Sequence, residues 1–133
     1  MSKTYLPDTN VLIDILNGFR VNLRRKLATD SRVILSLFVE GEFQAGISKT
    51  ARGKAAEHSL AKFIGLPNVV RAAPATTVAK RYGDTLRLLR SQGHPIPTND
   101  IWIAAHALEL GATLVTTDPH FKAIPLLDVL FPD

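Results

Sequence analysis

Four acidic residues stand where a carboxylate could act on a bound ligand: Asp8, Glu42, Asp100 and Asp118. Asp8 directly follows the apolar run TYLP, and Asp118 comes shortly after the similar run TLVT. Both runs predict short buried strands. Ligands of parallel α/β sheets bind beyond the carboxyl ends of the strands, so these two carboxylates are expected at one edge of such a sheet.

Glu42 is singled out by the helical periodicity of SLFVEGEFQAG, residues 36–46. At about 100° per residue, Glu42 shares a helix face with Phe38 and Val39, whereas Glu40 lies on the opposite side. Burying a lone carboxylate costs several kcal/mol unless it is paired or binds a cation. We therefore predict that Glu42 is functional and that Glu40 is a surface residue.

Asp100 lies at the start of a predicted helix, in PTNDIWIAAHALELG, whose apolar stripe includes Ile101 and Leu108. It has an ordinary structural explanation, because acids in a first helical turn interact favourably with the helix dipole. Asp8 could likewise be a helix N-cap, and Asp118 could belong to an Asp-Pro turn. For each aspartate taken alone, the structural and the functional explanation both stay open.

Convergence of the four carboxylates would require a positive counterion, because like charges at close range resist joint ionisation. The sequence has no cysteine, so thiolate zinc sites are excluded. Mg2+ and Mn2+ are hard cations that prefer carboxylate and water ligands and leave positions open for phosphate oxygens. The pattern predicts such a metal site, with Asp8, Glu42, Asp100 and Asp118 as its ligands.

Two neighbouring residues could support this site. Asn10 could orient Asp8, and Thr116 could hydrogen-bond a carboxylate or a phosphate. Asp14, four residues after Asn10 on a polar helix face, is predicted to have a surface or supporting use. The histidines have no metal-ligand spacing and are predicted to be solvated or internally hydrogen-bonded: His58, His94, His106 and His120.

The elements that would position these residues alternate between short strands and longer helices. Strands are predicted at residues 4–7, 33–36, 69–71 and 113–116, with a weaker one at residues 126–129. Between two of them, Val78, Tyr82, Leu86 and Leu89 form one apolar helix face. Helical connections imply a parallel sheet, so the expected fold class is α/β, a three-layer α/β/α sandwich.

One loop and two aromatic residues complete the structural expectations. The segment GHPIPTN, residues 93–99, is predicted to be a loop that ends with Thr98 or Asn99 as a helix cap. Trp102 and Phe121 are expected in the core or at a dimer interface.

Composition narrows the class of protein. The 133 residues, 46% hydrophobic and 21% charged, are enough for one domain across residues 1–133 with a single core. No apolar run resembles a signal peptide or a membrane span, and we expect a cytoplasmic protein. The formal net charge of +4 suits a polyanionic partner, although it is equally explained by a solvated surface.

Four motifs occur in the order and approximate spacing of the PIN domain: DTNVLID, SLFVEGEFQAG, PIPTNDIWIAAHAL and LVTTDPHF. Each contains one of the four acids. The chain resembles, more specifically, the VapC-type toxins of bacterial toxin–antitoxin pairs, and the resemblance covers almost its whole length. It implies that Asp8, Glu42, Asp100 and Asp118 form the acidic quartet of that family.

The resemblance also implies an activity and partners. Such proteins are metal-dependent endoribonucleases, usually homodimers, held inactive by a small VapB-like antitoxin whose tail covers the site. One or two Mg2+ or Mn2+ ions would activate a water that attacks the RNA phosphate in line. A transfer RNA or a ribosomal RNA loop is the expected kind of substrate. Basic residues that could guide RNA are Arg20, Arg24, Arg25, Lys49, Arg52 and Arg87.

Two other functions are compatible with parts of the pattern. A catalytically silent PIN-like module that binds RNA or protein would have a damaged quartet, and this quartet is intact. A phosphoaspartyl enzyme using Asp8 would want a second acid adjacent or two residues away, where Thr9 and Asn10 stand. No GxxxxGK[ST] or GxGxxG motif is present, which disfavours a nucleotide-binding enzyme.

Overall fold

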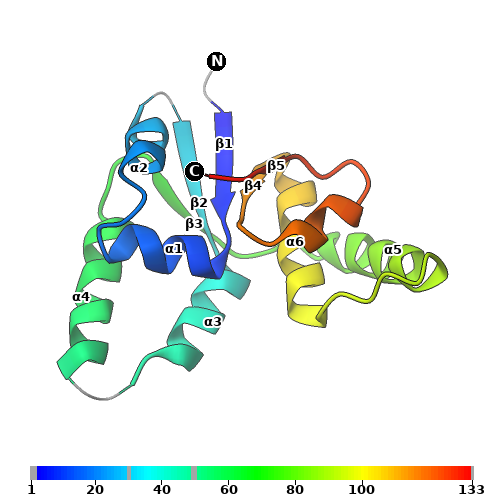
Figure 1. Ribbon diagram of the computed structural model, residues 1–133, viewed down its shortest axis with the longest axis horizontal. Coiled ribbons are helices and arrows are strands. Elements are labelled where there is room, and N and C mark those ends of the chain that lie inside the picture. The colour runs from blue at the N-terminus through cyan, green and yellow to red at the C-terminus, as the bar shows by residue number, and fades with distance from the viewer. Residues whose placement is uncertain (1–2, 30, 49–50, 133) are drawn as a thin grey trace.

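The computed structural model describes residues 3–29, 31–48 and 51–132 of the chain (Figure 1). Strands and helices alternate as expected for an α/β protein. The elements are β1 (Lys3–Pro7), α1 (Thr9–Leu16), α2 (Val21–Ala28), β2 (Ser31–Ser36), α3 (Leu37–Gly46), α4 (Ala51–Ile64), β3 (Val69–Ala72), α5 (Val78–Ser91), α6 (Thr98–Leu110), β4 (Thr113–Val115), the short 3-10 helix η1 (Pro119–Ala123) and β5 (Val129–Leu130).

The sheet has the strand order β3-β2-β1-β4-β5, and every neighbouring pair is parallel. The chain first adds β2 and β3 on one side of β1, and then crosses over to add β4 and β5 on the other side. Strand order therefore reverses at β1, which lies in the middle of the sheet. In such sheets the carboxyl ends of the strands at the reversal point form the ligand crevice.

Helices cover the sheet on both sides, which confirms the three-layer α/β/α prediction. In Figure 1, α1, α2 and α4 lie on one side of the strands and α5 and α6 on the other. Helix α3 continues directly from β2 and contacts both α1 and α6. This places the start of α3 between the two helical layers.

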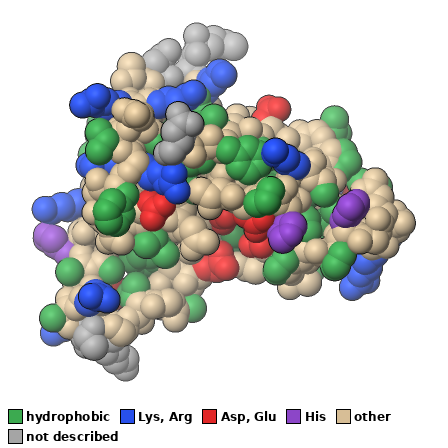
Figure 2. Space-filling view, in the orientation of Figure 1, with side chains coloured by type: hydrophobic (Ala, Val, Ile, Leu, Met, Phe, Trp, Pro, Cys, Tyr) green, Lys and Arg blue, Asp and Glu red, His purple; other side chains and the backbone are tan. Residues whose placement is uncertain are grey.

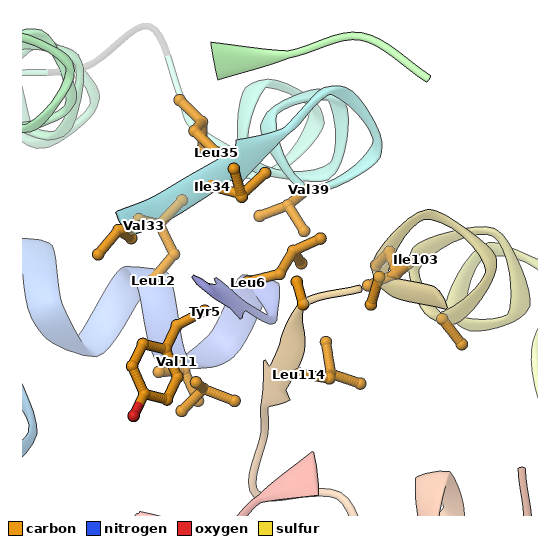
Figure 3. Close-up of a cluster of buried hydrophobic side chains, with 14 of the residues drawn as sticks. Tyr5, Leu6, Val11, Leu12, Val33, Ile34, Leu35, Val39, Ile103 and Leu114 are labelled. Atoms are coloured by element: carbon orange, nitrogen blue, oxygen red, sulfur yellow. The ribbon is translucent and has the colours of Figure 1, made fainter. Parts of the chain in front are cut away.

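The core explains why β1 reads as an apolar run rather than an alternating one. Tyr5 and Leu6 are successive residues of β1, point to opposite sides of the strand, and are both buried (Figure 3). Leu6 packs in the same cluster as Val39 of α3 and Ile103 of α6, whereas Tyr5 lies near Val11 of α1. A parallel sheet with helices on both faces buries both faces of its central strands.

The first four predicted strands are confirmed to within two residues at each end. The fifth is displaced: β5 is Val129–Leu130, and Leu126 is 91% exposed with a left-handed φ of 68°. A residue in that conformation turns the chain, so a strand cannot begin there.

The predicted helix caps of α6 are wrong. Thr98 and Asn99 are the first two helical residues, and Pro97 is the N-cap, without a side-chain hydrogen bond. The carbonyl oxygen of Pro97 accepts the first helical bond from the backbone N of Ile101 at 3.2 Å. The fixed φ of proline suits the entry to a helix, and the helix therefore starts one residue earlier than a capping side chain would place it.

Within the ranges described above, no helix combines the length and the apolar character needed to cross a membrane.

Candidate metal centre

Three of the four predicted acids come together at the carboxyl edge of the sheet. Asp8 follows β1, Glu42 is on α3, and Asp100 is in the first turn of α6. One carboxylate oxygen from each lies within 4.8 Å of the others. We call Asp8, Glu42 and Asp100 the acidic cluster. Figure 2 shows acidic side chains gathered near the middle of the face that it displays.

Asp8 belongs to the acidic cluster and also has the capping role that its position in the sequence allowed. It is the N-cap of α1, and its Oδ1 accepts a hydrogen bond from the backbone N of Thr9 at 2.7 Å. Its Oδ2 accepts a second one from Oγ1 of Thr116 at 2.9 Å. Asp8 is only 8% exposed, so these two donors fix a carboxylate that is almost out of contact with water. Capping the helix is therefore part of how the site is built.

Of the two predicted supporting residues, Thr116 makes a hydrogen bond to the carboxylate of Asp8, whereas Asn10 makes none. Thr116 is fully buried directly after β4 and reaches Asp8 across the pairing of β1 with β4. Asn10 is exposed and has no hydrogen-bond partner among the residues that the structure describes. One residue into α1, the helical rotation turns its side chain away from the strand end.

Thr9 is a site residue that the sequence reasoning missed. Its hydroxyl donates to Oε1 of Glu42 at 2.5 Å and so joins the start of α1 to α3. The sequence feature that could have indicated a role for Thr9 is its hydroxyl side chain, next to Asp8 in the first turn of a helix. Nothing in the sequence indicates, however, that this hydroxyl meets a residue 33 positions away.

Glu42 and Glu40 lie on different sides of α3, as predicted, but Glu40 is not a free surface residue. Its side chain is 15% exposed and forms an ion pair with Arg71 of β3, with Oε2 2.6 Å from Nη2. A second contact joins Oε1 to Nε of Arg71 at 3.1 Å. The carboxylate on the outer side of α3 therefore has a cationic partner, whereas Glu42 faces two other acids.

Asp118 is not part of the group that the described residues form around a common point. It is the N-cap of η1, and its Oδ1 accepts from the backbone N of His120 at 2.9 Å. The same oxygen is 3.1 Å from Nδ1 of the His120 ring. Its backbone N donates to Oγ1 of Thr116 at 3.1 Å. Asp118 therefore lies next to the acidic cluster, with its carboxylate engaged by a histidine.

The histidines mostly match the prediction. His58 and His94 are exposed, and His120 contacts Asp118. His106 differs, because it is fully buried and only half satisfied: Nδ1 is hydrogen-bonded to Oγ of Ser36 at 2.8 Å, while Nε2 has no partner among the described residues.

The remaining candidates are structural. Phe121 is buried in the core, and Trp102 stacks on Tyr82 with ring centroids 3.8 Å apart and on Phe38 at 5.4 Å. Asp14 pairs with Arg20, Oδ2 to Nε, at 3.1 Å, which fits its predicted supporting use. Lys49 lies outside the described residues.

Burial and mutual repulsion raise the pKa values of two carboxyl groups of the site. Burial, followed by the charges of Asp8, Glu42 and Asp118, raises the pKa of Asp100 to about 6. Burial also raises the pKa of Asp8, with smaller contributions from Glu42 and Asp118, although the hydrogen bonds from Thr9 and Thr116 oppose it. The charge of His120 lowers the pKa of Asp100 by a smaller amount, so the effects that disfavour the ionised form prevail at both acids.

The residues of the acidic cluster fit a divalent metal ion. The donors are carboxylate oxygens, the ligands that Mg2+ and Mn2+ prefer, and they come from three different elements fixed by the sheet. A cation there would relieve the repulsion that raises the pKa of Asp8 and Asp100. The site is therefore suited in both chemistry and electrostatics to such an ion.

Comparison with known proteins agrees with this geometry. Residues 5–127 match the family model described as PIN domain. The chain is 31% identical over 128 residues to Ribonuclease VapC2 of Rickettsia felis, covering 92% of this chain and 93% of the relative. It is 30% identical over 115 residues to Ribonuclease VapC1 of Haemophilus influenzae, covering 84% of each.

Solved structures of similar proteins have the same fold as this chain. VapBC2 of Rickettsia felis, determined with a DNA fragment from its promoter, contains a chain that matches with a TM-score of 0.87 and 28% identity, covering 98% of this chain and 99% of that one. VapBC-1 of nontypeable Haemophilus influenzae matches with a TM-score of 0.82 and 25% identity, covering 96% of each chain. The family match spans most of the sequence and includes all three residues of the acidic cluster, and the chain therefore belongs to the PIN-domain family.

Proposed function

We propose that this protein is an endoribonuclease, the toxin of a type II toxin–antitoxin pair, with residues 1–133 forming one ribonuclease domain. The observation that carries the proposal is the convergence of Asp8, Glu42 and Asp100, from three separate elements, in a chain of the PIN-domain family. Its relatives named Ribonuclease VapC, at 30% and 31% identity, support the same activity.

In this proposal, Asp8, Glu42 and Asp100 hold the metal, Mg2+ or Mn2+, as one or two ions. When bound, such a cation supplies Lewis acidity toward a phosphodiester and lowers the pKa of water. Asp118 remains a predicted fourth ligand. No nucleophilic side chain is required, so the expected products carry a 5′-phosphate and a 3′-hydroxyl.

Hydrogen bonds within the protein fix the orientation of the carboxylates before a metal binds. Thr116 donates to one oxygen of Asp8, and Thr9 donates to one oxygen of Glu42. Each carboxylate keeps further lone pairs for a cation, because an ionised carboxyl group has about four acceptor positions. The two threonines are therefore positioning residues for the acidic cluster.

The proposed regulatory partner is a VapB-like antitoxin. Two of the matching structures are VapBC complexes, from Rickettsia felis and Haemophilus influenzae. A cluster of carboxylates is a suitable receptor for an inserted Arg or Lys side chain of an antitoxin tail. We also propose a homodimer and a cytoplasmic location. Light scattering of the purified protein tests the dimer, and addition of the upstream gene product in excess should abolish cleavage.

The decisive experiment is to induce the protein without its antitoxin and to sequence the 5′ ends of cellular RNA. New 5′-phosphate ends at a defined site are expected, in a transfer RNA or a ribosomal RNA. Asp8→Asn, Glu42→Gln and Asp100→Asn should each abolish growth arrest and cleavage. Glu40→Gln is the matched control on the same helix and should retain both, because Glu40 faces Arg71 instead of the cluster.

Two outcomes would contradict the proposal. Products with a cyclic 2′,3′-phosphate would exclude attack by water. A folded protein that binds RNA but cuts none in the presence of Mn2+ would favour the silent binding module.

A further inference from the structure

The helices α3 and α6, which carry Glu42 and Asp100, meet at a second point outside the acidic cluster. There the Oγ of Ser36 is hydrogen-bonded to Nδ1 of His106 at 2.8 Å. Both side chains are fully buried. Because Nε2 of the ring has no partner among the described residues, this bond is the polar contact that holds the imidazole. A hydrogen bond shielded from water in this way is stronger than an exposed one.

The two meeting points lie at matched positions along the helices. Glu42 comes six residues after Ser36, and Asp100 comes six residues before His106. Six helical residues span about 9 Å. The start of α3 therefore faces the later part of α6, and the two acids face each other roughly that distance away, where α3 continues and α6 begins.

Aromatic packing supports the hydrogen bond at its end of the contact. The ring of Phe38 lies edge-on to the ring of His106, with centroids 5.7 Å apart, and stacks on Trp102 at 5.4 Å. Phe38 belongs to α3 and the other two rings belong to α6. Such ring pairs have preferred geometries, so the two helices are packed in a defined arrangement beside the Ser36–His106 bond.

The two ends of this contact act in opposite directions in the metal-free protein. Ser36 and His106 attract one another, whereas Glu42 and Asp100 are acids whose carboxylate oxygens lie within 4.8 Å of each other. The hydrogen bond therefore limits how far repulsion can separate the acids. Their separation matters for the ion, because Mg2+ requires a near-ideal octahedron with bonds of about 2.0–2.1 Å, while Ca2+ accepts flexible geometry at about 2.3–2.6 Å.

We infer that the Ser36–His106 bond is a clamp that sets the ion selectivity of the acidic cluster, and that both residues are positioning residues for Glu42 and Asp100. This inference rests on the metal centre of the proposed function. With the clamp in place, the carboxylates stay close enough together to bind the small ion Mg2+. Without the clamp the acids separate, and the affinity for Mg2+ falls more than the affinity for Ca2+.

Isothermal titration calorimetry with Mg2+ and with Ca2+ tests the clamp. His106→Leu removes the partner of Ser36 but leaves the cap of α3 in place. It should weaken Mg2+ binding roughly tenfold, the size of effect expected when a group that orients a metal ligand is lost. Ca2+ binding should change by less than about threefold, because its coordination is flexible. His106→Asn, whose shorter side chain still offers a polar atom to Ser36, should restore most of the preference for Mg2+.

Ser31→Ala is the matched control, because it removes another buried hydroxyl at the opposite end of β2. The hydroxyl of Ser31 donates to the carbonyl oxygen of Leu27, away from the acidic cluster. This variant should have a lower Tm but an unchanged ratio of the Mg2+ and Ca2+ dissociation constants. It therefore separates a loss of stability from a loss of selectivity.

Ser36→Ala provides a second removal of the clamp, from the other side of the bond, and gives the same comparison if His106→Leu does not fold. Circular dichroism identifies the folded variants. An equal loss of affinity for both ions in a folded variant without the clamp would overturn the inference, since a general defect of the site has that effect. Unchanged affinity for both ions would overturn it as well.

Failure of the proposed metal centre is distinguishable from failure of the clamp. If the unmodified protein binds neither Mg2+, Ca2+ nor Mn2+, the metal centre fails, and thermal melts in chelator then judge the clamp. Asp100→Asn should raise Tm more in the presence of Ser36 than in the Ser36→Ala background, because only the clamp holds the acids together. The difference should be roughly 2 °C, the shift produced by a modest coupling energy in a domain of this size. Equal Tm shifts in both backgrounds would overturn the clamp.

Discussion

Asp100 is the residue at which the repulsion inside the acidic cluster is most visible. It is half-buried in the first turn of α6, where the helix dipole favours a negative charge, yet its pKa is raised to about 6. Burial and three neighbouring acids therefore outweigh the dipole. A residue that only capped a helix would show the opposite balance.

Replacing the carboxylate of Asp100 distinguishes its effect on the stability of the metal-free protein from its contribution to metal binding. In chelator, Asp100→Asn should be at least as stable as the unmodified protein, because the substitution relieves repulsion. Mn2+ at a hundredfold excess over its Kd should stabilise the unmodified protein by about 2.7 kcal/mol and the variant far less. Thermal melts of both proteins, with chelator and with Mn2+, measure this. Equal metal-induced shifts would remove Asp100 from the site.

Stability should also depend on pH through Asp100. Its pKa is about 6 in the folded protein and near the ordinary 3.8 in the unfolded chain, so the folded state binds more protons between these values. Its contribution to the free energy of unfolding therefore falls as pH rises through this window.

The buried His106 acts in the opposite direction, because burial lowers its pKa below 6.5. The comparison with Asp100→Asn removes that effect, since both proteins contain the histidine. Urea unfolding in chelator between about pH 4 and pH 7 should show that the stability difference, unmodified minus variant, falls as pH rises. A difference that stays constant would contradict the assigned pKa.

At the level of elements, the junction of α3 and α6 holds two acids of the cluster in place. Ser36 ends β2 and caps α3: its hydroxyl accepts from the backbone N of Phe38 at 3.2 Å and is hydrogen-bonded to Nδ1 of His106 on α6 at 2.8 Å. Glu42 lies on one of these helices and Asp100 on the other. The Ser36–His106 bond therefore connects the elements that carry them.

Ser36→Ala and His106→Leu test this junction as a pair. Each should destabilise the protein by roughly 1–3 kcal/mol, because each leaves a buried polar group without its partner. The double variant should lose less than the sum, with a coupling energy of about 0.5–2 kcal/mol in urea unfolding. Strict additivity would mean that the bond does not join the two helices energetically.

Sequence patterns predicted the elements better than the contacts between them. Asp8 and Glu42 could be identified because a strand end and a helix face are local properties of the chain. The link from Thr9 to Glu42 and the link from Thr116 to Asp8 depend on tertiary approach, which no local pattern contains. The β5 strand has only two residues, too few for a periodicity to place it.

For the molecule as a whole, an acidic site lies within a chain of net charge +4. Figure 2 shows Lys and Arg side chains mainly on the side of α2 and α4, away from the acidic group. Arg24 and Arg25 of α2 and Lys62 of α4 line a groove of about 710 Å3 between these helices. The basic side chains that could attract RNA and the acidic cluster proposed to bind a cation therefore lie on different parts of the surface.

This division predicts the effect of salt on cleavage. kcat/KM should fall with increasing salt, with a slope of about −0.7 per phosphate contacted in a plot of log kcat/KM against log salt concentration, because counterions are released from a single strand. The kcat at saturating RNA should change much less. Arg24→Gln should make the slope shallower by about 0.7, the value for one phosphate contact. The control is Arg87→Gln, because the guanidinium of Arg87 already pairs with Asp84. A slope unchanged in Arg24→Gln would exclude Arg24 from binding RNA.

The central place of β1 matters while the protein is being synthesised. Thr116, which fixes Asp8, stands 108 residues later in the chain, and the backbone N of Asp8 donates to Val115 on the same late strand. The ribosome therefore produces the first acid of the acidic cluster long before the strand that completes its surroundings. Until β4 emerges, β1 can pair only with β2, and the carboxylate of Asp8 lacks the threonine that fixes it. Asp8 therefore reaches its final hydrogen-bond partners only near the end of translation.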